Sequence, residues 1–353
     1  MAAHGETIAI RAGEGIAVDA LTEHLRGRIE GAESGVVLEQ FPNGHSNLTY
    51  LLRTGGREYV LRRPPLGPVA PKAHDMVREY HVLHAVHPHF PQAPRVFLLC
   101  EDPAVLGAPF FVMERRRGVV LREQVPPAIA AVAAHPRMIG EAFLDTMVRL
   151  HGIDVSAPGV RELGKPDGYV ERQVRGWADR WERAKTEETA AMDQVVKWLS
   201  ARIPPPSPPS LIHNDYKLDN IMLDAGAPGR VEAVLDWEMA TLGDPLSDFG
   251  LTLCYWVWAT DPGVRAAGIP ALTRAPGWFT RDELVEQYAR RSGRDVKHVG
   301  YNEVLGVFKL AVIIQQIYCR FHRGQTRDDR FRNFGKSATA LASLAARLAE
   351  RYS

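Results

Sequence analysis

An eight-residue segment in the second half of the chain carries the side chains best suited to chemistry. It reads His213-Asn-Asp215-Tyr-Lys217-Leu-Asp-Asn220. A carboxylate such as Asp215 can orient an attacking hydroxyl group and accept its proton. A lysine two places later can contact a phosphate, and amide and carboxylate oxygens are ligands that Mg²⁺ accepts. These residue types at this spacing indicate the transfer of a phosphoryl group to a hydroxyl.

A second acidic segment follows a predicted strand. Val231 to Leu235 is rich in β-formers, and Asp236-Trp237-Glu238 comes directly after it. In this interpretation Asp215 is the base, and Lys217 contacts the transferred phosphate. Asn220 and Asp236 are then the Mg²⁺ ligands.

The alternative interpretation is a polar turn between two strands. Asp215 and Asp219 would then only accept hydrogen bonds from loop amides. The strand that ends in Asp236 favours the catalytic interpretation, because a surface turn does not require an aspartate at the end of the next strand.

Residues that could bind the phosphates of a nucleotide lie in the first third of the chain. The segment Phe41-Pro-Asn43-Gly44-His45-Ser46-Asn47 links two predicted strands and could lay backbone amides over the phosphates. It contains a single glycine, and an ordinary hairpin turn explains it equally well. Its assignment to nucleotide binding therefore depends on the other motifs.

A basic residue and its expected acidic partner follow this segment. Arg62 lies on a predicted strand where a cation would meet the α- and β-phosphates, and Glu79 on the next helix is its expected ion-pair partner. Val60 and Arg62 share one face of that strand, so Arg63 should point to the other face. Without the other motifs, Arg62 and Glu79 would be interpreted as solvated surface charges.

A short charged segment separates two regions of different pattern. The predicted strand Pro109 to Met113 continues through Glu114 into residues 115–118, a predicted hinge. The backbone from Glu114 onwards would face an adenine ring. A strand buried in the core would have the same residues, and only the position between two lobes favours a role in adenine binding.

The elements around these residues predict an α+β fold with two lobes. Strands dominate before the hinge, and helices with a small strand insert follow it. The capping box Thr280-Arg-Asp-Glu283 marks the start of a helix that continues through Arg290. The expected strands are Gly35–Phe41, Leu48–Arg53, Glu58–Arg63, Val96–Cys100, Pro109–Met113, Leu211–His213, Ile221–Leu223 and Val231–Leu235; the other expected helices are Ala17–Ile29, His74–Val86, Met138–His151, Gly168–Lys185 and Met192–Ile203.

Composition narrows the class of protein. The 353 residues carry a formal net charge of +1, which favours neither nucleic acid nor a membrane surface as a partner. The three cysteines are scattered and fit a reducing compartment, so we expect a cytoplasmic protein without disulfides. We expect no signal peptide and no membrane span, because the most apolar stretch, Val304 to Ile317, is interrupted by Lys309 and two glutamines.

These segments together resemble the superfamily of aminoglycoside phosphotransferases and choline kinases. The resemblance covers roughly Ala17 to Ser353 and includes Leu150-His151 and Gly243-Asp-Pro-Leu-Ser-Asp248. Ser46-Asn-Leu-Thr-Tyr50, Leu61-Arg-Arg-Pro-Pro65 and Arg78-Glu-Tyr80 are most similar to one branch. That branch is the kinase-like domain found alone in bacteria or fused to acyl-CoA dehydrogenases in animals.

The resemblance implies a protein-kinase-like fold. Residues 1–114 would form the nucleotide-binding lobe, 115–118 the hinge, and 119–353 the helical lobe with the catalytic loop and acceptor pocket. It further implies ATP and Mg²⁺ as cofactors, and as acceptor a small molecule, with a hydroxyacyl-CoA as the specific expectation.

The chain departs from the protein-kinase pattern in two places. Arg62 stands where a lysine is usual, and a planar guanidinium is not equivalent to an ammonium. Asp236-Trp237-Glu238 lacks the glycine of the protein-kinase motif, and no Ala-Pro-Glu segment follows. A small-molecule acceptor is therefore favoured over a protein. Asp244 and Asp248 could be further metal ligands, but we expect them to cap the next helix and to bond the catalytic loop.

Charge and aromatic residues bear on the acceptor. Arg320 to Ser353 holds eight basic and three acidic residues, and a local charge of +5 suits an anionic acceptor better than a polycationic aminoglycoside. A solvated basic helix face is the alternative. Aromatic residues could line an acyl tunnel or simply belong to the core. They are Tyr255, Trp256, Trp258, Trp278 and Tyr318.

Two further functions stay open at this stage. The first is an aminoglycoside-type antibiotic kinase, which the basic segment disfavours. The second is a nucleotide-binding pseudokinase that acts as an interaction module. Asp215, Asn220 and Asp236 are all present, and the loss of one or more of them is what a dead kinase would be expected to show.

Overall fold

The chain folds into two compact units. The computed structural model describes residues 6–42, 47–65, 75–257, 272–326 and 328–353. The first unit comprises Met1–Arg117 together with Glu232–Glu238, and the second comprises Gly118–Val231 together with Met239–Ser353. A short piece from the second half of the sequence therefore completes the first unit. The boundary at residue 117 falls within the predicted hinge, whose function stays a prediction.

A five-stranded antiparallel sheet forms the centre of the first unit, as the sequence predicted. Its strand order is β1-β2-β3-β5-β4. The turn between β2 and β3 is tight: Gly55 has φ +53°, and a Cβ there would lie 2.6 Å from the Cα of Gly31. The strands are β1 (Val37–Gln40), β2 (Leu48–Thr54), β3 (Arg57–Arg63), β4 (Val96–Cys100) and β5 (Phe110–Glu114).

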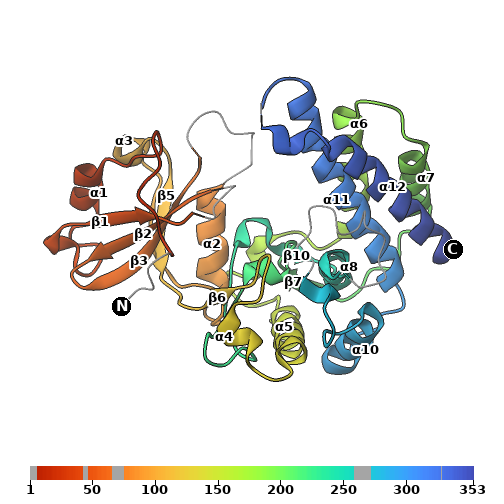
Figure 1. Ribbon diagram of the computed structural model, residues 1–353, viewed down its shortest axis with the longest axis horizontal. Coiled ribbons are helices and arrows are strands. Elements are labelled where there is room, and N and C mark those ends of the chain that lie inside the picture. The colour runs from red at the N-terminus through yellow and green to blue at the C-terminus, as the bar shows by residue number, and fades with distance from the viewer. Residues whose placement is uncertain (1–5, 43–46, 66–74, 258–271, 327) are drawn as a thin grey trace. The chain divides into compact units, whose positions relative to one another are not determined.

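The two faces of this sheet pack against different helices. Tyr50 and Leu61 lie on the face whose apolar cluster includes residues of α1 (Val18–Leu25) and α3 (Pro103–Leu106). α2 (Met76–Val86) lies beside β4 and β5 (Figure 1). The α1 helix is shorter than the predicted Ala17–Ile29, since Gly27 has φ +71° and does not continue a helix.

Helices build most of the second unit. Its longest, α11, packs against α6, α8 and α12 (Figure 1). The short strands β6 and β10 were not predicted. The helices are α4 (Pro127–Ala130), α5 (His135–His151), α6 (Tyr169–Ala184), α7 (Ala190–Ala201), α8 (Pro245–Tyr255), α10 (Arg281–Ser292), α11 (Val299–His322) and α12 (Phe334–Arg351). The short strands of this unit are β6 (Val119–Val120), β7 (Ser210–Ile212), β8 (Ile221–Leu223) and β10 (Thr241–Gly243). Strand β9 (Val231–Val234) belongs to the first unit from Glu232 onwards.

The α11 helix is a core helix. By length and composition it could cross a membrane, but 61% of its most apolar window is buried inside the unit. It approaches α8 through glycines: a Cβ on Gly306 would lie 2.9 Å from the carbonyl oxygen of Gly250. The capping box that begins α10 is present as predicted, with the Thr280 hydroxyl accepting a hydrogen bond from the Glu283 amide.

Candidate active site

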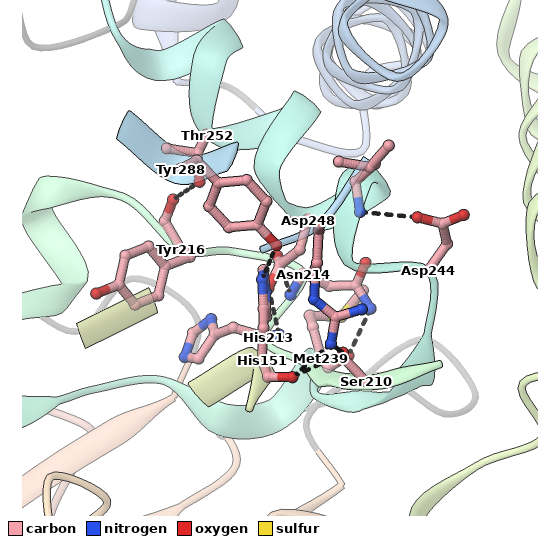
Figure 2. A network of polar contacts seen from close by, with 12 residues as sticks. His151, Ser210, His213, Asn214, Tyr216, Met239, Asp244, Asp248, Thr252 and Tyr288 are labelled. Atoms are coloured by element: carbon pink, nitrogen blue, oxygen red, sulfur yellow. Dashed lines mark hydrogen bonds and ion pairs between the residues drawn. The ribbon is translucent and has the colours of Figure 1, made fainter. Parts of the chain in front are cut away.

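The segment predicted to be catalytic is a loop between β7 and β8, and Asp248 holds its start. The amide of His213 donates to Oδ2 of Asp248 at 2.7 Å, and the amide of Asn214 donates to Oδ1 at 2.7 Å (Figure 2). Asn214 has φ +63°, a left-handed conformation that asparagine tolerates better than most residues. The expectation that Asp248 bonds this loop is confirmed, as is the cap that Asp244 provides for α8 at Leu246.

Asp248 is fully buried and belongs to a larger polar network. Its Oδ2 lies 3.2 Å from Nε2 of His151, whose Nδ1 lies 2.7 Å from the hydroxyl of Tyr288 (Figure 2). Burial opposes ionisation of Asp248, but hydrogen bonds from His151 and the His213 amide outweigh it and lower the pKa of the carboxyl. The network thus keeps an ionised carboxylate under the loop.

Asp215 follows directly and is held on both carboxylate oxygens. Lys217 Nζ lies 2.9 Å from Oδ1, and Asn220 Nδ2 donates to Oδ2 at 2.7 Å. Asn220 Nδ2 also donates to the Asp215 backbone carbonyl at 2.9 Å. Burial opposes the charge on Lys217, yet the neighbouring Asp215 carboxylate raises the pKa of the ammonium above its ordinary value. The three predicted residues therefore form one cluster.

The first unit contains a second charged cluster. Arg62 forms ion pairs with Glu79 at 3.2 Å and with Asp236 at 3.3 Å. Asp236 has φ +66°, a strained backbone for a residue with a side chain. Burial raises the pKa of Glu79 from 4.5 to about 7; Arg62 opposes this, and the carboxylates of Asp236 and Glu238 support it. The predicted Arg62–Glu79 pair is present.

Further contacts hold this cluster in place. Arg78, one residue before Glu79, donates to the backbone carbonyl of Glu238. The Asn47 amide donates to the Glu238 carboxylate at 3.1 Å. Arg63 is buried without an ion pair among the described residues, on the opposite face of β3 from Arg62, as the strand alternation predicted.

Other predicted nucleotide contacts have less support. Asn43, Gly44, His45 and Ser46 lie outside the described residues. Glu114, at the end of β5, accepts a hydrogen bond from the Arg95 amide at 3.1 Å and pairs with Arg116 at 2.9 Å. Its side chain is thus occupied, which leaves the adenine-facing role to the backbone.

Asn220 and Asp236 each carry an oxygen of the kind that Mg²⁺ accepts. Both hydrogen bonds given by the Asn220 side chain come from its nitrogen and end on Asp215, so the Oδ1 oxygen is the atom left for a cation. Asp236 offers a carboxylate in the first unit. The described residues contain no group of three His, Cys, Asp or Glu side chains that could hold a metal.

A cavity of about 260 Å³ lies in the second unit, and its wall includes Lys217 and Asp219 of the loop predicted to be catalytic. Apolar residues from α5, α8, α11 and α12 form most of the remainder. Of the aromatic residues for which an acyl tunnel or the core was open, Tyr255 and Trp256 line this cavity and Trp278 and Tyr318 do not, while Trp258 lies outside the described residues. The acyl chain as its occupant stays a prediction. The lining residues are Leu121, Phe143, Lys217, Leu218, Asp219, Thr252, Tyr255, Trp256, Leu272, Thr273, Leu310, Ile314, Ile317, Phe334 and Ser337.

Sequence reasoning missed the lining residues of α11 and α12. Leu310, Ile314 and Ile317 repeat at helical spacing, which a buried helix face shows as well, so the spacing alone does not predict a cavity wall. Only the tertiary packing distinguishes a wall that borders a cavity from one that touches another helix.

Curated relatives cover almost the whole chain. Acyl-CoA dehydrogenase family member 11 of Gallus gallus is 32% identical over 90% of this chain and 41% of its own length. Member 10 of Mus musculus is 31% identical over 93% of this chain and 30% of its own length. The chain thus spans less than half the length of these relatives.

Solved structures share the fold. A protein of Ralstonia eutropha, described as a candidate aminoglycoside phosphotransferase, superposes with a TM-score of 0.82 at 30% identity, over 96% of this chain and 99% of that one. A choline kinase of Cryptosporidium parvum gives 0.64 at 11% identity over 94% and 95%. Aminoglycoside phosphotransferase APH(4)-Ia, solved with AMP-PNP and hygromycin B, gives 0.60 at 18% over 93% and 98%. The α+β, kinase-like fold is therefore confirmed.

The sequence profile of the phosphotransferase enzyme family matches residues 37–286, which include both charged clusters. Because this match spans most of the chain and the Ralstonia eutropha protein matches over its full length, the chain belongs to the phosphotransferase enzyme family.

Proposed function

We propose that this protein is an ATP-dependent kinase that phosphorylates a hydroxyl group of a small metabolite, with a hydroxyacyl-CoA as the acceptor. The observation that carries the proposal is the Asp215 cluster next to a largely apolar cavity. A carboxylate fixed on both oxygens can receive a proton from a hydroxyl that the cavity positions.

Asp215 would orient the acceptor hydroxyl and take its proton as the oxygen attacks the γ-phosphorus. The new O–P bond forms while the bond to the β,γ-bridging oxygen breaks, and ADP leaves. Lys217, paired with Asp215 at 2.9 Å, would offset negative charge on the transferred group. Asp248 holds the loop amides and so fixes the position of Asp215.

The nucleotide would be bound by residues of the first unit. Arg62, oriented by Glu79 at 3.2 Å, would contact the α- and β-phosphates as a bidentate donor. The backbone after Glu114 would face the adenine ring, and the segment from Asn43 to Asn47 would cover the phosphates. Asp236 and the Oδ1 oxygen of Asn220 would hold Mg²⁺, which when bound neutralises the phosphates.

Two observations support an acyl acceptor. The cavity wall is mainly apolar, which suits a hydrocarbon chain and not a polycation. The curated relatives carry acyl-CoA dehydrogenase names, although this chain matches less than half of their length. The basic segment gives weaker support, because Arg330 and Arg332 are ion-paired with Asp328 and Asp329.

An antibiotic kinase is the second candidate, since APH(4)-Ia shares the fold and was solved with hygromycin B. The test is ADP release from MgATP with separate acceptors: 4-hydroxyacyl-CoAs, free hydroxy acids, choline and aminoglycosides. Asp215→Asn serves as the blank. Turnover with hydroxyacyl-CoAs alone would support the proposal. Turnover with aminoglycosides alone would mean that the acceptor is an aminoglycoside and not a hydroxyacyl-CoA. MgATP binding without turnover for any acceptor would favour the pseudokinase alternative.

A further inference from the structure

A tyrosine in the cavity wall has a hydroxyl group that the chain does not use. Tyr255, the last residue of α8, is half-buried and lines the cavity. Among the described residues its hydroxyl forms no hydrogen bond. The oxygen is open to solvent, because the unbonded polar atoms that are sealed inside the described residues do not include it. A molecule inside the cavity can therefore reach this hydroxyl.

The other tyrosines of the second unit show that such a hydroxyl is unusual here. Buried tyrosine hydroxyls usually find a hydrogen-bond partner. Tyr318 on α11 also lacks one among the described residues, but it does not line the cavity. Tyr255 thus combines an unused hydroxyl with a place in the wall. The tyrosines whose hydroxyls bond to the chain are Tyr169, Tyr216, Tyr288, Tyr301 and Tyr352.

The remaining polar side chains of the wall do not offer a free donor. Lys217 pairs with Asp215 at 2.9 Å, and the carboxylate of Asp219, once ionised, accepts hydrogen bonds but does not donate them. Tyr255 therefore supplies the unspent side-chain donor among these wall residues. The other donors of the wall give their hydrogens to backbone carbonyls: Thr252 to Tyr216 at 2.7 Å, Trp256 to Phe279 at 2.8 Å, Thr273 to Val257 at 2.6 Å and Ser337 to Asn333 at 3.5 Å.

The ring of Tyr255 lies close to the proposed base. The Lys217 ammonium is 5.1 Å from the ring centroid, and the same ammonium is 2.9 Å from the Asp215 carboxylate. Helix α11 contributes apolar side chains to the same cavity wall. An acceptor whose hydroxyl is at Asp215 and whose chain is in the cavity would therefore pass Tyr255. A few polar groups in a mainly apolar pocket usually fix the orientation of the ligand.

Tyr255 remains a donor at neutral pH. Burial raises the pKa of its hydroxyl above the ordinary value; the carboxylates of Asp215 and Asp219 add to this, and Lys217 opposes it. The hydroxyl is therefore neutral, and it can donate to a neutral oxygen such as that of a carbonyl group. A neutral donor gives no charge attraction to a polycationic acceptor.

We propose that the Tyr255 hydroxyl donates a hydrogen bond to the carbonyl oxygen of the acyl group that enters the cavity. Tyr255 then selects hydroxylated acyl compounds over hydroxylated compounds that have no carbonyl group. It contacts the substrate and takes no part in the bonds that form and break. That the bound molecule is the phosphoryl acceptor rests on the proposed function, whereas the hydrogen bond itself can be measured without turnover.

The test is calorimetric titration of the full chain with two matched probes: 4-hydroxydecanoyl-CoA, a thioester, and 4-hydroxydecyl-CoA, the thioether without the carbonyl oxygen. Tyr255→Phe keeps the ring and removes the hydroxyl. Tyr318→Phe, the same change outside the cavity, is the matched control. The wild type and the control should bind the thioester about fivefold more tightly than the thioether, the usual effect of one hydrogen bond. Tyr255→Phe should lose this preference through weaker thioester binding, with thioether binding unchanged.

A structural role for the hydroxyl would give a different result. Because the hydroxyl bonds to none of the described residues, Tyr255→Phe should melt at the wild-type temperature. A lower melting temperature with equal weakening of both probes would overturn the carbonyl contact. The contact is also overturned if thioester affinity is the same in Tyr255→Phe and the wild type, or if neither probe binds the wild type.

Turnover distinguishes this contact from the proposed function. In Tyr255→Phe the KM for the thioester should rise about fivefold with little change in kcat. A fall in kcat at unchanged thioester affinity would place the hydroxyl on the transferred phosphoryl group and overturn the carbonyl contact. Equal KM in the wild type and Tyr255→Phe would keep the kinase and reject the contact. Thioester preference that depends on Tyr255, in a chain without phosphoryl transfer, would keep the contact and reject the kinase.

Discussion

Asp248 accepts the backbone amides of His213 and Asn214 on its two carboxylate oxygens, each at 2.7 Å. The backbone at Asn214 is left-handed, and the next residue is Asp215. A carboxylate that is 0% exposed therefore fixes an unusual backbone conformation directly before the predicted base. The same carboxylate contacts His151 of α5, so the loop and two helices share one anchor.

Replacement of this anchor should impair both stability and turnover. In Asp248→Asn one loop amide would face an NH₂ group, because an amide side chain offers only one acceptor oxygen. We expect a loss of about 3–5 kcal/mol in the free energy of unfolding, measured with urea. Asp244→Asn is the control, since asparagine caps a helix about as well as aspartate, and its cost should stay below about 1 kcal/mol. Equal losses in both variants would contradict the anchoring role.

Replacement of Asp215, the proposed base, should reduce turnover without destabilising the fold. Asp215→Asn should leave the melting temperature nearly unchanged, because its side chain is 22% exposed and the amide can still bond Asn220. Turnover should fall by roughly 10²–10⁴. Asp219→Asn, on the same loop and also next to the cavity, is the matched control and should retain far more activity. Unchanged turnover in Asp215→Asn would remove it from the mechanism.

The sequence predicted the cluster of Asp215, Lys217 and Asn220, because these residue types stand at fixed spacings in one short segment. It predicted the ion pair between Arg62 and Glu79 from a basic residue on a strand and an acidic residue on the next helix. It also predicted the five-stranded sheet, since the β-rich runs are bounded by turn residues. It did not predict that Lys309 is buried, because this lysine was treated only as an interruption of an apolar stretch. Whether a lysine in such a stretch is paired depends on α6 and α8, which are more than 50 residues away in the chain.

Mg²⁺-dependent nucleotide binding should depend on Asp236. Asp236→Ala should weaken MgATP binding at least tenfold while leaving the much weaker binding of Mg²⁺-free ATP nearly unchanged. Alanine is also disfavoured at φ +66°, so Asp236→Asn, which tolerates that backbone, separates the loss of charge from strain. Calorimetric titration with and without Mg²⁺ measures both. Normal MgATP binding in both variants would exclude the metal role.

A change in the cavity wall should alter the KM for the acceptor and not the KM for ATP. Ile314 of α11 lines the cavity and is 9% exposed. Ile314→Trp would fill part of the 260 Å³, and we expect the KM for a long-chain hydroxyacyl-CoA to rise at least tenfold with little change for a short-chain one. The KM for ATP should stay constant. A uniform rise for all chain lengths would indicate general damage to the unit.

Glu79 should make the free energy of unfolding decrease as pH rises. Its pKa in the folded chain is about 7, above the ordinary 4.5, because the carboxyl is buried. The stability that the protonated form contributes is therefore complete below pH 4.5, and it is lost as pH rises through 7. In Mg²⁺-free buffer, the decrease in unfolding free energy from pH 5 to pH 8 should be smaller in Glu79→Gln than in the wild type.

Glu58→Gln is the control for this measurement, since Glu58 lies on β3 and pairs with Arg53 and Arg117 nearer the surface. Its decrease over the same pH range should match that of the wild type. An equal decrease in Glu79→Gln and the wild type would mean that Arg62 keeps Glu79 ionised throughout. In that case the pair behaves as a fixed ion pair, and Glu79→Gln would instead lower stability at every pH above 5 by leaving Arg62 with Asp236 alone.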